Sequence, residues 1–258
     1  MLIDSHCHLN YPGLAERRDE VLANARAVGV GGFLNISTRQ SEWGDVIAPA
    51  EANADVWASV GVHPHEADAH PDLGAAALVE ASTHPRVVAI GECGLDYFYD
   101  KSDRAAQRER FAAHIEAART TGLPLIVHTR DAEDDTAAIL TEAAEQGGVG
   151  GVLHCFTGSA KLAATALDLG FYISLSGIVT FKNARDLQDV AKTVPQERLL
   201  VETDSPFLAP VPHRGKTCEP AFVADTAAFV AVLRGEELDA LADATTTNFF
   251  RLFAKAAA

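Results

Sequence analysis

Six residues whose side chains bind divalent metals stand near the ends of short apolar runs in this sequence. They are His6, His8, Glu92, His128, His154 and Asp204. Imidazole nitrogens suit Zn, Mn or Co, while carboxylates beside a phosphate also accept Mg. These residue types therefore indicate a hydrolase that uses divalent metal.

The spacing of His6 and His8 fits two ligands of one ion. On a strand, side chains at positions i and i+2 share a face and stand about 6.6 Å apart along it. A lone His-x-His pair is a weak indication, and a single histidine at a strand end is more often a hydrogen-bonded structural residue. The combination of several such residues at several strand ends favours a metal site over that structural alternative.

Glu92 lies between the other candidates in the chain, and a glutamate can bridge two ions about 3.5–4 Å apart, as in two-metal hydrolases. We assign one ion to His6, His8, Glu92 and Asp204, and a second ion to Glu92, His128 and His154. The predicted cofactors are thus two divalent cations, either Mg, Mn or Zn. Glu92 and Asp204 are the predicted catalytic residues, because Glu92 holds both ions and Asp204 is placed to take a proton from a water molecule.

Eight runs rich in Val, Ile and Leu predict strands, and segments with helical spacing separate them. The predicted strands are Leu2–His8, Gly32–Ser37, Val56–Val62, Val87–Glu92, Leu125–His128, Gly151–Cys155, Tyr172–Ser176 and Leu199–Glu202. A helix is predicted at Arg104–Thr121 and a final helix at Asn248–Lys255, packed on the outside. This alternation predicts a parallel sheet of the α/β class, and eight units favour a closed (β/α)8 TIM-type barrel.

Active sites of such barrels gather at the C-terminal ends of the strands. All six predicted ligands stand at or just after these ends, so the fold should bring them to one mouth. His63 follows the third strand and is predicted to contact substrate there. Glu202 shares the strand face of Asp204, where it is predicted to contact substrate, to tune the metal site or to hold a further ion.

Two arginines are candidate phosphate ligands, because a guanidinium presents a planar fork of donors. They are Arg130, two residues after His128, and Arg214; a surface salt bridge is the alternative explanation for each. The net charge of −15, with 36 acidic and 21 basic residues, argues against an extended nucleic-acid surface. A small site at which metals and a few arginines supply positive charge remains compatible with it.

The length of 258 residues matches the roughly 250 of one barrel, so we expect a single domain over residues 1–258. No apolar stretch has the length of a signal peptide or a membrane span. The four cysteines, Cys7, Cys93, Cys155 and Cys218, form no CxxC pair and fit reduced thiols, which indicates the cytoplasm. Strand alternation predicts that Cys7, Cys93 and Cys155 point toward the helices as packing residues.

Several segments in order along the chain resemble the signatures of the TatD deoxyribonuclease family. They are Asp4-Ser5-His6-Cys7-His8, Gly61-Val62-His63-Pro64, Gly91-Glu92-Cys93-Gly94-Leu95-Asp96, His128-Thr129-Arg130, His154-Cys155-Phe156-Thr157-Gly158, Glu202-Thr203-Asp204-Ser205-Pro206 and Pro212-His213-Arg214-Gly215-Lys216. The resemblance implies a metal-dependent barrel hydrolase that acts on DNA, as a 3′-to-5′ exonuclease on single-stranded ends. It also implies metal binding by the six residues named above. Thr217-Cys218-Glu219-Pro220 departs from the family's usual Arg-Asn-Glu-Pro, which puts substrate contacts there in doubt.

Two other functions compete with the DNA-directed hydrolase. One is a small-molecule hydrolase of the amidohydrolase type, such as a phosphotriesterase or lactonase, which uses the same barrel and a similar His-x-His opening. The acidic net charge favours it, while the ordered set of motifs disfavours it. The other is a non-catalytic binding protein, whose mark would be broken ligands. Single-stranded DNA is the expected partner, with no membrane and no obligate protein partner.

Overall fold

The computed structural model describes residues 1–257 and shows eight parallel strands, each paired with the next in chain order. The strands are β1 (Leu2–Cys7), β2 (Val30–Asn35), β3 (Val56–Val60), β4 (Val87–Asp96), β5 (Leu125–Arg130), β6 (Gly151–Leu153), β7 (Tyr172–Leu175) and β8 (Leu199–Val201). The chain just after β8 meets β1 through a parallel bridge between Cys7 and Ser205. The backbone N–H of His8 donates to Ser205 O at 2.8 Å, which brings the last strand to the first. The predicted (β/α)8 barrel is confirmed.

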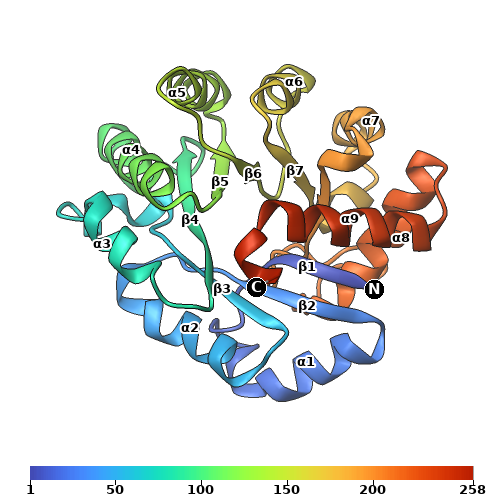
Figure 1. Ribbon diagram of the computed structural model, residues 1–258. Helices are drawn as coiled ribbons and strands as arrows, with labels where there is room; N and C mark the ends of the chain where they lie inside the picture. Colours follow the sequence, from blue (N-terminus) through green and yellow to red (C-terminus); the bar gives the residue numbers. More distant parts are fainter. Residues whose placement is uncertain (258) are drawn as a thin grey trace.

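Helices alternate with the strands and surround them (Figure 1). They are α1 (Arg18–Ala27), α2 (Trp43–Ala52), α3 (Ala75–Ala81), α4 (Arg104–Thr121), α5 (Glu133–Glu145), α6 (Ala160–Asp168), α7 (Arg185–Thr193), α8 (Val223–Arg234) and α9 (Leu238–Leu252). The predicted bounds of α4 are confirmed, and Gly122 ends it with a φ of +71°. A left-handed residue of this kind satisfies the last carbonyls of a helix, and glycine adopts it without strain.

The prediction for the last helix is wrong in extent and in place. Helix α9 begins at Leu238, ten residues before the predicted start at Asn248. It crosses one end of the barrel in Figure 1, and its Phe249 and Phe253 are fully buried in a cluster with barrel residues such as Trp57. The physical reason is that apolar side chains inside the barrel would be exposed to water at this end, and α9 buries them.

Strand β4 continues four residues beyond the predicted end at Glu92. It passes unusually close to β5 at Gly94, where an added Cβ would stand 2.1 Å from the carbonyl oxygen of His128. Gly94 also has a φ of +123°, a conformation that side chains other than glycine rarely adopt. Glycine is therefore required here to hold Glu92 and His128 on adjoining strands.

The cysteines divide into two groups. Cys7 and Cys93 are buried in the apolar layer between strands and helices, as strand alternation predicts. The prediction is wrong for Cys155, because β6 ends at Leu153 and alternation no longer applies. Cys155 has a φ of +42°, and its Sγ lies 3.2 Å from Ser176 Oγ.

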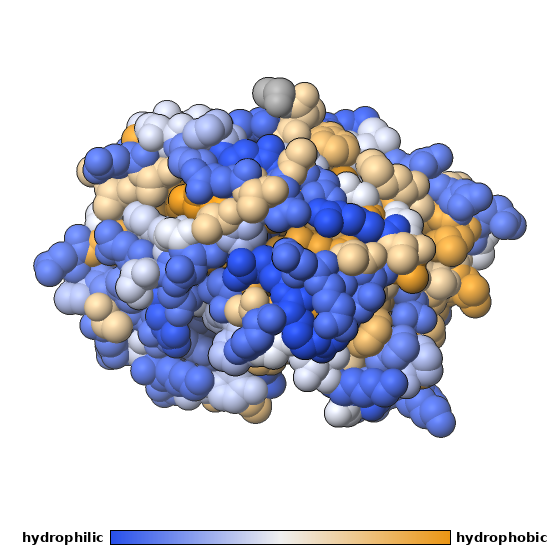
Figure 2. All heavy atoms as spheres, turned by 90° about the horizontal axis from the view of Figure 1, so that it is seen from below, coloured by the Kyte–Doolittle hydropathy of each residue, from blue (hydrophilic) through white to orange (hydrophobic). Residues whose placement is uncertain are grey.

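The outer surface is mostly polar. Figure 2 shows one side of the molecule, where hydrophilic residues predominate and apolar residues gather in small groups. This is expected where each helix turns a single apolar face toward the barrel. Every helix within residues 1–257 is too short or too polar to cross a lipid bilayer.

Candidate metal centre

The six predicted ligands lie together at the C-terminal mouth of the barrel. His6, Glu92 and His128 lie within β1, β4 and β5, while His8, His154 and Asp204 follow the ends of β1, β6 and β8. Their convergence follows from the fold, because parallel strands of a barrel all end at one rim. Side chains far apart in the chain therefore surround one point.

The carboxylate of Glu92 is the centre of this group and faces different histidines with each oxygen. Its Oε1 lies 2.8 Å from His154 Nε2 and 3.3 Å from His128 Nδ1. Its Oε2 lies 3.4 Å from His6 Nε2 and 4.0 Å from His8 Nε2. The carboxylate thus has two sides, each lined by two imidazoles.

Asp204 completes the side that His6 and His8 line. Its Oδ1 lies 3.6 Å from His6 Nε2 and 3.4 Å from His8 Nε2. Its backbone has a φ of +56°, and its N–H donates to His6 O at 2.9 Å. The side chain of Asp204 retains 15% exposure, so it reaches both the histidines and the mouth.

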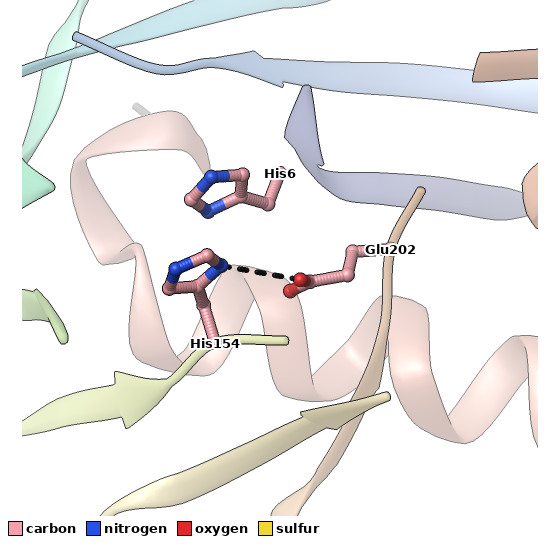
Figure 3. A group of neighbouring side chains, drawn as sticks. All are labelled: His6, His154 and Glu202. Carbon is pink, nitrogen blue, oxygen red and sulfur yellow. Dashed lines mark hydrogen bonds and ion pairs between the residues drawn. The ribbon is translucent and has the colours of Figure 1, made fainter. Parts of the chain in front are cut away.

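Unsatisfied buried atoms show that this site fits a cation. Within the described residues, both ring nitrogens of His6 and Oε2 of Glu202 are buried without a hydrogen-bond partner. The ring of His6 stacks on that of His154, with centroids 3.8 Å apart and planes 7° from parallel (Figure 3). Buried polar atoms normally find partners, and nitrogen and carboxylate donors converging in this way suit a divalent metal.

The charges within the site also favour a cation. Burial alone raises the pKa of Glu92, but the positive charge of His154 and the hydrogen bonds from His128 and His154 outweigh it and hold the pKa well below the usual range. For His154, burial lowers the pKa, yet the charge of Glu92 and the hydrogen bond to Glu202 raise it well above its ordinary value. The carboxylates thus stabilise positive charge at the place where a metal would bind.

Each of three histidines is held by a partner on its other ring nitrogen. Nδ1 of His8 lies 3.2 Å from Ile36 O, and Nε2 of His128 lies 3.0 Å from Asp96 Oδ2. Nδ1 of His154 lies 3.3 Å from Glu202 Oε1. Such partners fix the tautomer and orientation of a metal-binding imidazole.

Glu202 lies beside His154, to which a dashed line joins it in Figure 3, and is fully buried. Its Oε1 accepts a hydrogen bond from the backbone N–H of Cys155 at 2.7 Å. The structure leaves Glu202 no exposed surface for the substrate contact that the sequence suggested. Its contacts correspond to the alternative expectation, in which it tunes the site by holding His154.

His63 also approaches Glu92, with Nε2 3.3 Å from Oε1. Its Nδ1, however, accepts a hydrogen bond from the backbone N–H of His65 at 3.0 Å. Burial lowers the pKa of His63 to about 4, so the ring is neutral and its single proton is on Nε2. His63 is therefore held as a hydrogen-bond donor toward Glu92 and the mouth.

Asp96 contacts two histidines of the mouth but was not among the predicted site residues. It is fully buried, and its Oδ2 lies 2.9 Å from His65 Nε2 and 3.0 Å from His128 Nε2. Its Oδ1 accepts backbone N–H groups of Phe98 and Tyr99, which fixes the turn after β4. The sequence did contain a signal, because Asp96 ends the Gly91–Asp96 motif. A predicted strand that continued to Asp96 would have placed this carboxylate at the mouth.

The two predicted phosphate ligands differ in their surroundings. Arg130 ends β5 two residues after His128, and its guanidinium carbon lies 3.9 Å from the ring centroid of Phe98. Arg214 lies on the loop after β8 and stacks on Phe181 at 3.7 Å. Within residues 1–257, neither arginine forms an ion pair, so the salt-bridge explanation fails for both. Only Arg130 is joined by its strand to the histidine cluster.

A (β/α)8 barrel whose mouth holds a carboxylate among histidines is the architecture of a metal-dependent hydrolase. Comparison with known proteins agrees with this class. The family model described as TatD related DNase matches residues 3–254. The chain belongs to the TatD family.

Among curated relatives, the uncharacterized metal-dependent hydrolase YcfH of Escherichia coli strain K12 is 48% identical over 255 residues, which cover 98% of this chain and 95% of YcfH. A protein of Klebsiella pneumoniae strain 342 named 3′-5′ ssDNA/RNA exonuclease TatD is 35% identical over 257 residues, covering 98% and 97%. The crystal structure of YjjV, a TatD homologue from Escherichia coli K12, has a TM-score of 0.92 at 31% identity and covers 98% of each chain. This chain is accordingly a metal-dependent hydrolase of that family.

Proposed function

We propose that this hydrolase cleaves phosphodiester bonds of DNA, as a 3′-to-5′ exonuclease on single-stranded ends. The observation that carries the proposal is the two-sided contact of Glu92, with His6 and His8 at one oxygen and His128 and His154 at the other. Two adjacent cations are the arrangement that nucleases use to clamp a phosphate. The name of the Klebsiella relative supports the choice of nucleic acid.

The residues around Glu92 would hold two divalent cations, one with His6, His8 and Asp204 and the other with His128 and His154. When bound, such ions polarise a phosphoryl oxygen and lower the pKa of water toward about 7. Mg, Mn and Zn are all compatible with this mixture of nitrogen and oxygen ligands. The protein's part is to hold the imidazoles in fixed tautomers, through Asp96 and Glu202.

Asp204 is the proposed proton acceptor for the attacking water. Burial raises the pKa of Asp204, but the hydrogen bond from His8 and the charge of His6 lower it by more, so the net pKa is below its ordinary value. The carboxylate is therefore ionised at neutral pH. Its partial exposure lets it reach a water molecule in the mouth. His63 Nε2–H and the Arg130 guanidinium are the proposed donors to the phosphoryl oxygens, while Arg214 is a more distant phosphate contact.

A small-molecule hydrolase, such as a phosphotriesterase or lactonase, is the second candidate. The net charge of −15 favours it, because a strongly acidic protein repels a polyanion.

We also place the protein in the cytoplasm, since its cysteines are all free.

The test is degradation of end-labelled single-stranded DNA by purified protein, with chelator and then with Mg, Mn or Zn restored. We expect stepwise shortening from the 3′ end that chelator abolishes and metal restores. Intact DNA under every metal, together with hydrolysis of a lactone or phosphotriester, would replace the proposal by the second candidate.

The variant Asp204→Asn tests the role of Asp204 as proton acceptor separately from any role in the stability of the fold. Loss of general-base catalysis should lower kcat on single-stranded DNA by about 100-fold or more, with an unchanged melting temperature of the metal-free protein. The side chains have nearly the same shape, so packing is retained. Unaltered kcat would remove Asp204 from the mechanism.

A further inference from the structure

Three aromatic side chains stand half-exposed around the metal centre. Phe98 is 53%, Tyr99 51% and Phe207 50% exposed. Phe98 and Tyr99 stand two and three residues after Asp96, the last residue of β4, and Phe207 stands three residues after Asp204 in the loop that follows β8. A planar apolar partner that stacks on such a half-exposed ring removes more of it from water.

Phe207 lies on the Asp204 side of the centre. Its ring centroid is 6.4 Å from that of His8, in an edge-to-face arrangement. Tyr11 stacks on His8 at 4.6 Å and meets Phe207 edge to face at 6.0 Å, with its hydroxyl 2.8 Å from Thr38 Oγ1. Phe207 therefore packs next to His8, a predicted metal ligand, and next to Tyr11, which stacks on His8.

Phe98 and Tyr99 lie on the His128 side. The Arg130 guanidinium carbon lies 3.9 Å from the Phe98 ring centroid and 4.7 Å from that of Tyr99. The Tyr99 ring is in turn 5.3 Å from His65, which contacts Asp96. We call Phe98, Tyr99 and Arg130 the aromatic–arginine cluster.

The charge of the aromatic–arginine cluster suits an anionic partner. Arg130 forms no ion pair within residues 1–257, although acidic residues outnumber basic ones 36 to 21 in the chain. Arg130 itself lines a pocket whose other walls include Asp131, Glu133, Asp134 and Asp135, and these carboxylates repel phosphate. A phosphate near Arg130 therefore belongs on the side of the aromatic rings and the metal centre.

We propose that Phe207 and the aromatic–arginine cluster are two separate stacking faces, which hold two neighbouring unpaired nucleobases on either side of the phosphodiester at Glu92. This inference rests on the proposed nuclease function. Stacking on aromatic and guanidinium planes changes affinity by about 5- to 150-fold per base and accepts every base.

The two stacking faces also explain why the proposed substrate is single-stranded rather than double-stranded DNA. Phe207 adjoins His8, which faces Oε2 of Glu92, whereas Tyr99 adjoins His65, which shares Asp96 with His128 on the Oε1 side. Neighbouring bases must splay apart to reach both, which bases in a duplex cannot do while stacked and paired. Stacking also gives an acidic protein a way to bind nucleic acid without a basic surface.

The test combines protein variants with oligonucleotides that lack one base. Tetrahydrofuran replaces the terminal or the penultimate nucleotide at the 3′ end of a single-stranded substrate, and KM and kcat are measured for each. The variants are Phe207→Leu and the double variant Phe98→Leu/Tyr99→Leu, which keep apolar volume but lose the ring face. Phe250→Leu is the matched control, because Phe250 is partly exposed and packs on Trp57 at the other end of the barrel.

Wild type and the Phe250 control should lose about ten-fold or more in kcat/KM for each missing base. Phe207→Leu should become insensitive to one missing base and remain sensitive to the other, and the double variant should show the reverse. Variants that remain sensitive to both missing bases overturn the stacking proposal while leaving the nuclease function intact. Wild-type protein that hydrolyses a lactone but no oligonucleotide overturns both.

Discussion

At the scale of single residues, orientation matters as much as the presence of a ligand. His8, His128 and His154 each have one ring nitrogen fixed by Ile36, Asp96 or Glu202, which turns the other nitrogen toward Glu92 or Asp204. His63 is fixed the opposite way, because its Nδ1 accepts a hydrogen bond from His65. The same side-chain type therefore provides the predicted metal ligands and a hydrogen-bond donor within one site.

Asp96 should be a positioning residue for His128. In Asp96→Asn, Oδ1 can still accept from Phe98 and Tyr99, but the negative charge facing His128 is lost. We expect the affinity for Mn²⁺, measured by titration calorimetry, to fall about 10- to 100-fold. The matched control is Asp135→Asn, a carboxylate that contacts Tyr97 near the mouth. Equal affinities of both variants would contradict the assigned role.

The convergence of the six predicted ligands could be expected from the sequence, because each is a polar residue at the end of an apolar run. Asp96 could not, because Gly94 interrupts the apolar pattern and the continuation of β4 depends on its close approach to β5. The burial of Glu202 could not be predicted either. The alternation of side chains along a strand does not distinguish a residue exposed at the mouth from one buried against His154. Helix α9 was misplaced because the need to cover the barrel end arises only in the closed barrel.

At the scale of elements, His114 joins α4 to the loop after β3. It is fully buried, Nε2 accepts the backbone N–H of Val62 at 3.0 Å, and Nδ1 lies 2.6 Å from Arg110 O. His114 is thus a structural residue. Val62 precedes His63, so this contact supports the mouth from behind.

His114 should make the fold less stable in acid. Burial lowers its pKa from 6.5 to about 4. Between these values the unfolded chain binds a proton that the folded chain does not, so the free energy of unfolding falls as pH falls, by about 2 kcal/mol at pH 5.

The variant His114→Gln keeps an acceptor for Val62 but does not titrate. Its unfolding free energy, measured with urea at pH 7 and pH 5, should therefore decrease less than that of wild type. The partly exposed His84 provides the control His84→Gln, which should retain the wild-type difference. An undiminished pH dependence in His114→Gln would contradict a neutral buried ring.

At the scale of the whole molecule, the charge of −15 limits how this protein can bind a polyanion. Phosphate contacts of single strands weaken with salt by a slope of about 0.7 per contact. Because Arg130 and Arg214 are the proposed contacts, KM for single-stranded DNA should rise less than about ten-fold between 50 and 200 mM salt at constant metal. A rise of about 100-fold or more would indicate an extended basic surface that the composition does not provide.

The central claim is that the two oxygens of Glu92 serve two ions at once. Its most direct test is anomalous diffraction from crystals grown with Mn²⁺. The account predicts two peaks about 3.5–4 Å apart, one beside His6, His8 and Asp204 and the other beside His128 and His154. A single peak, or peaks away from Glu92, would contradict it.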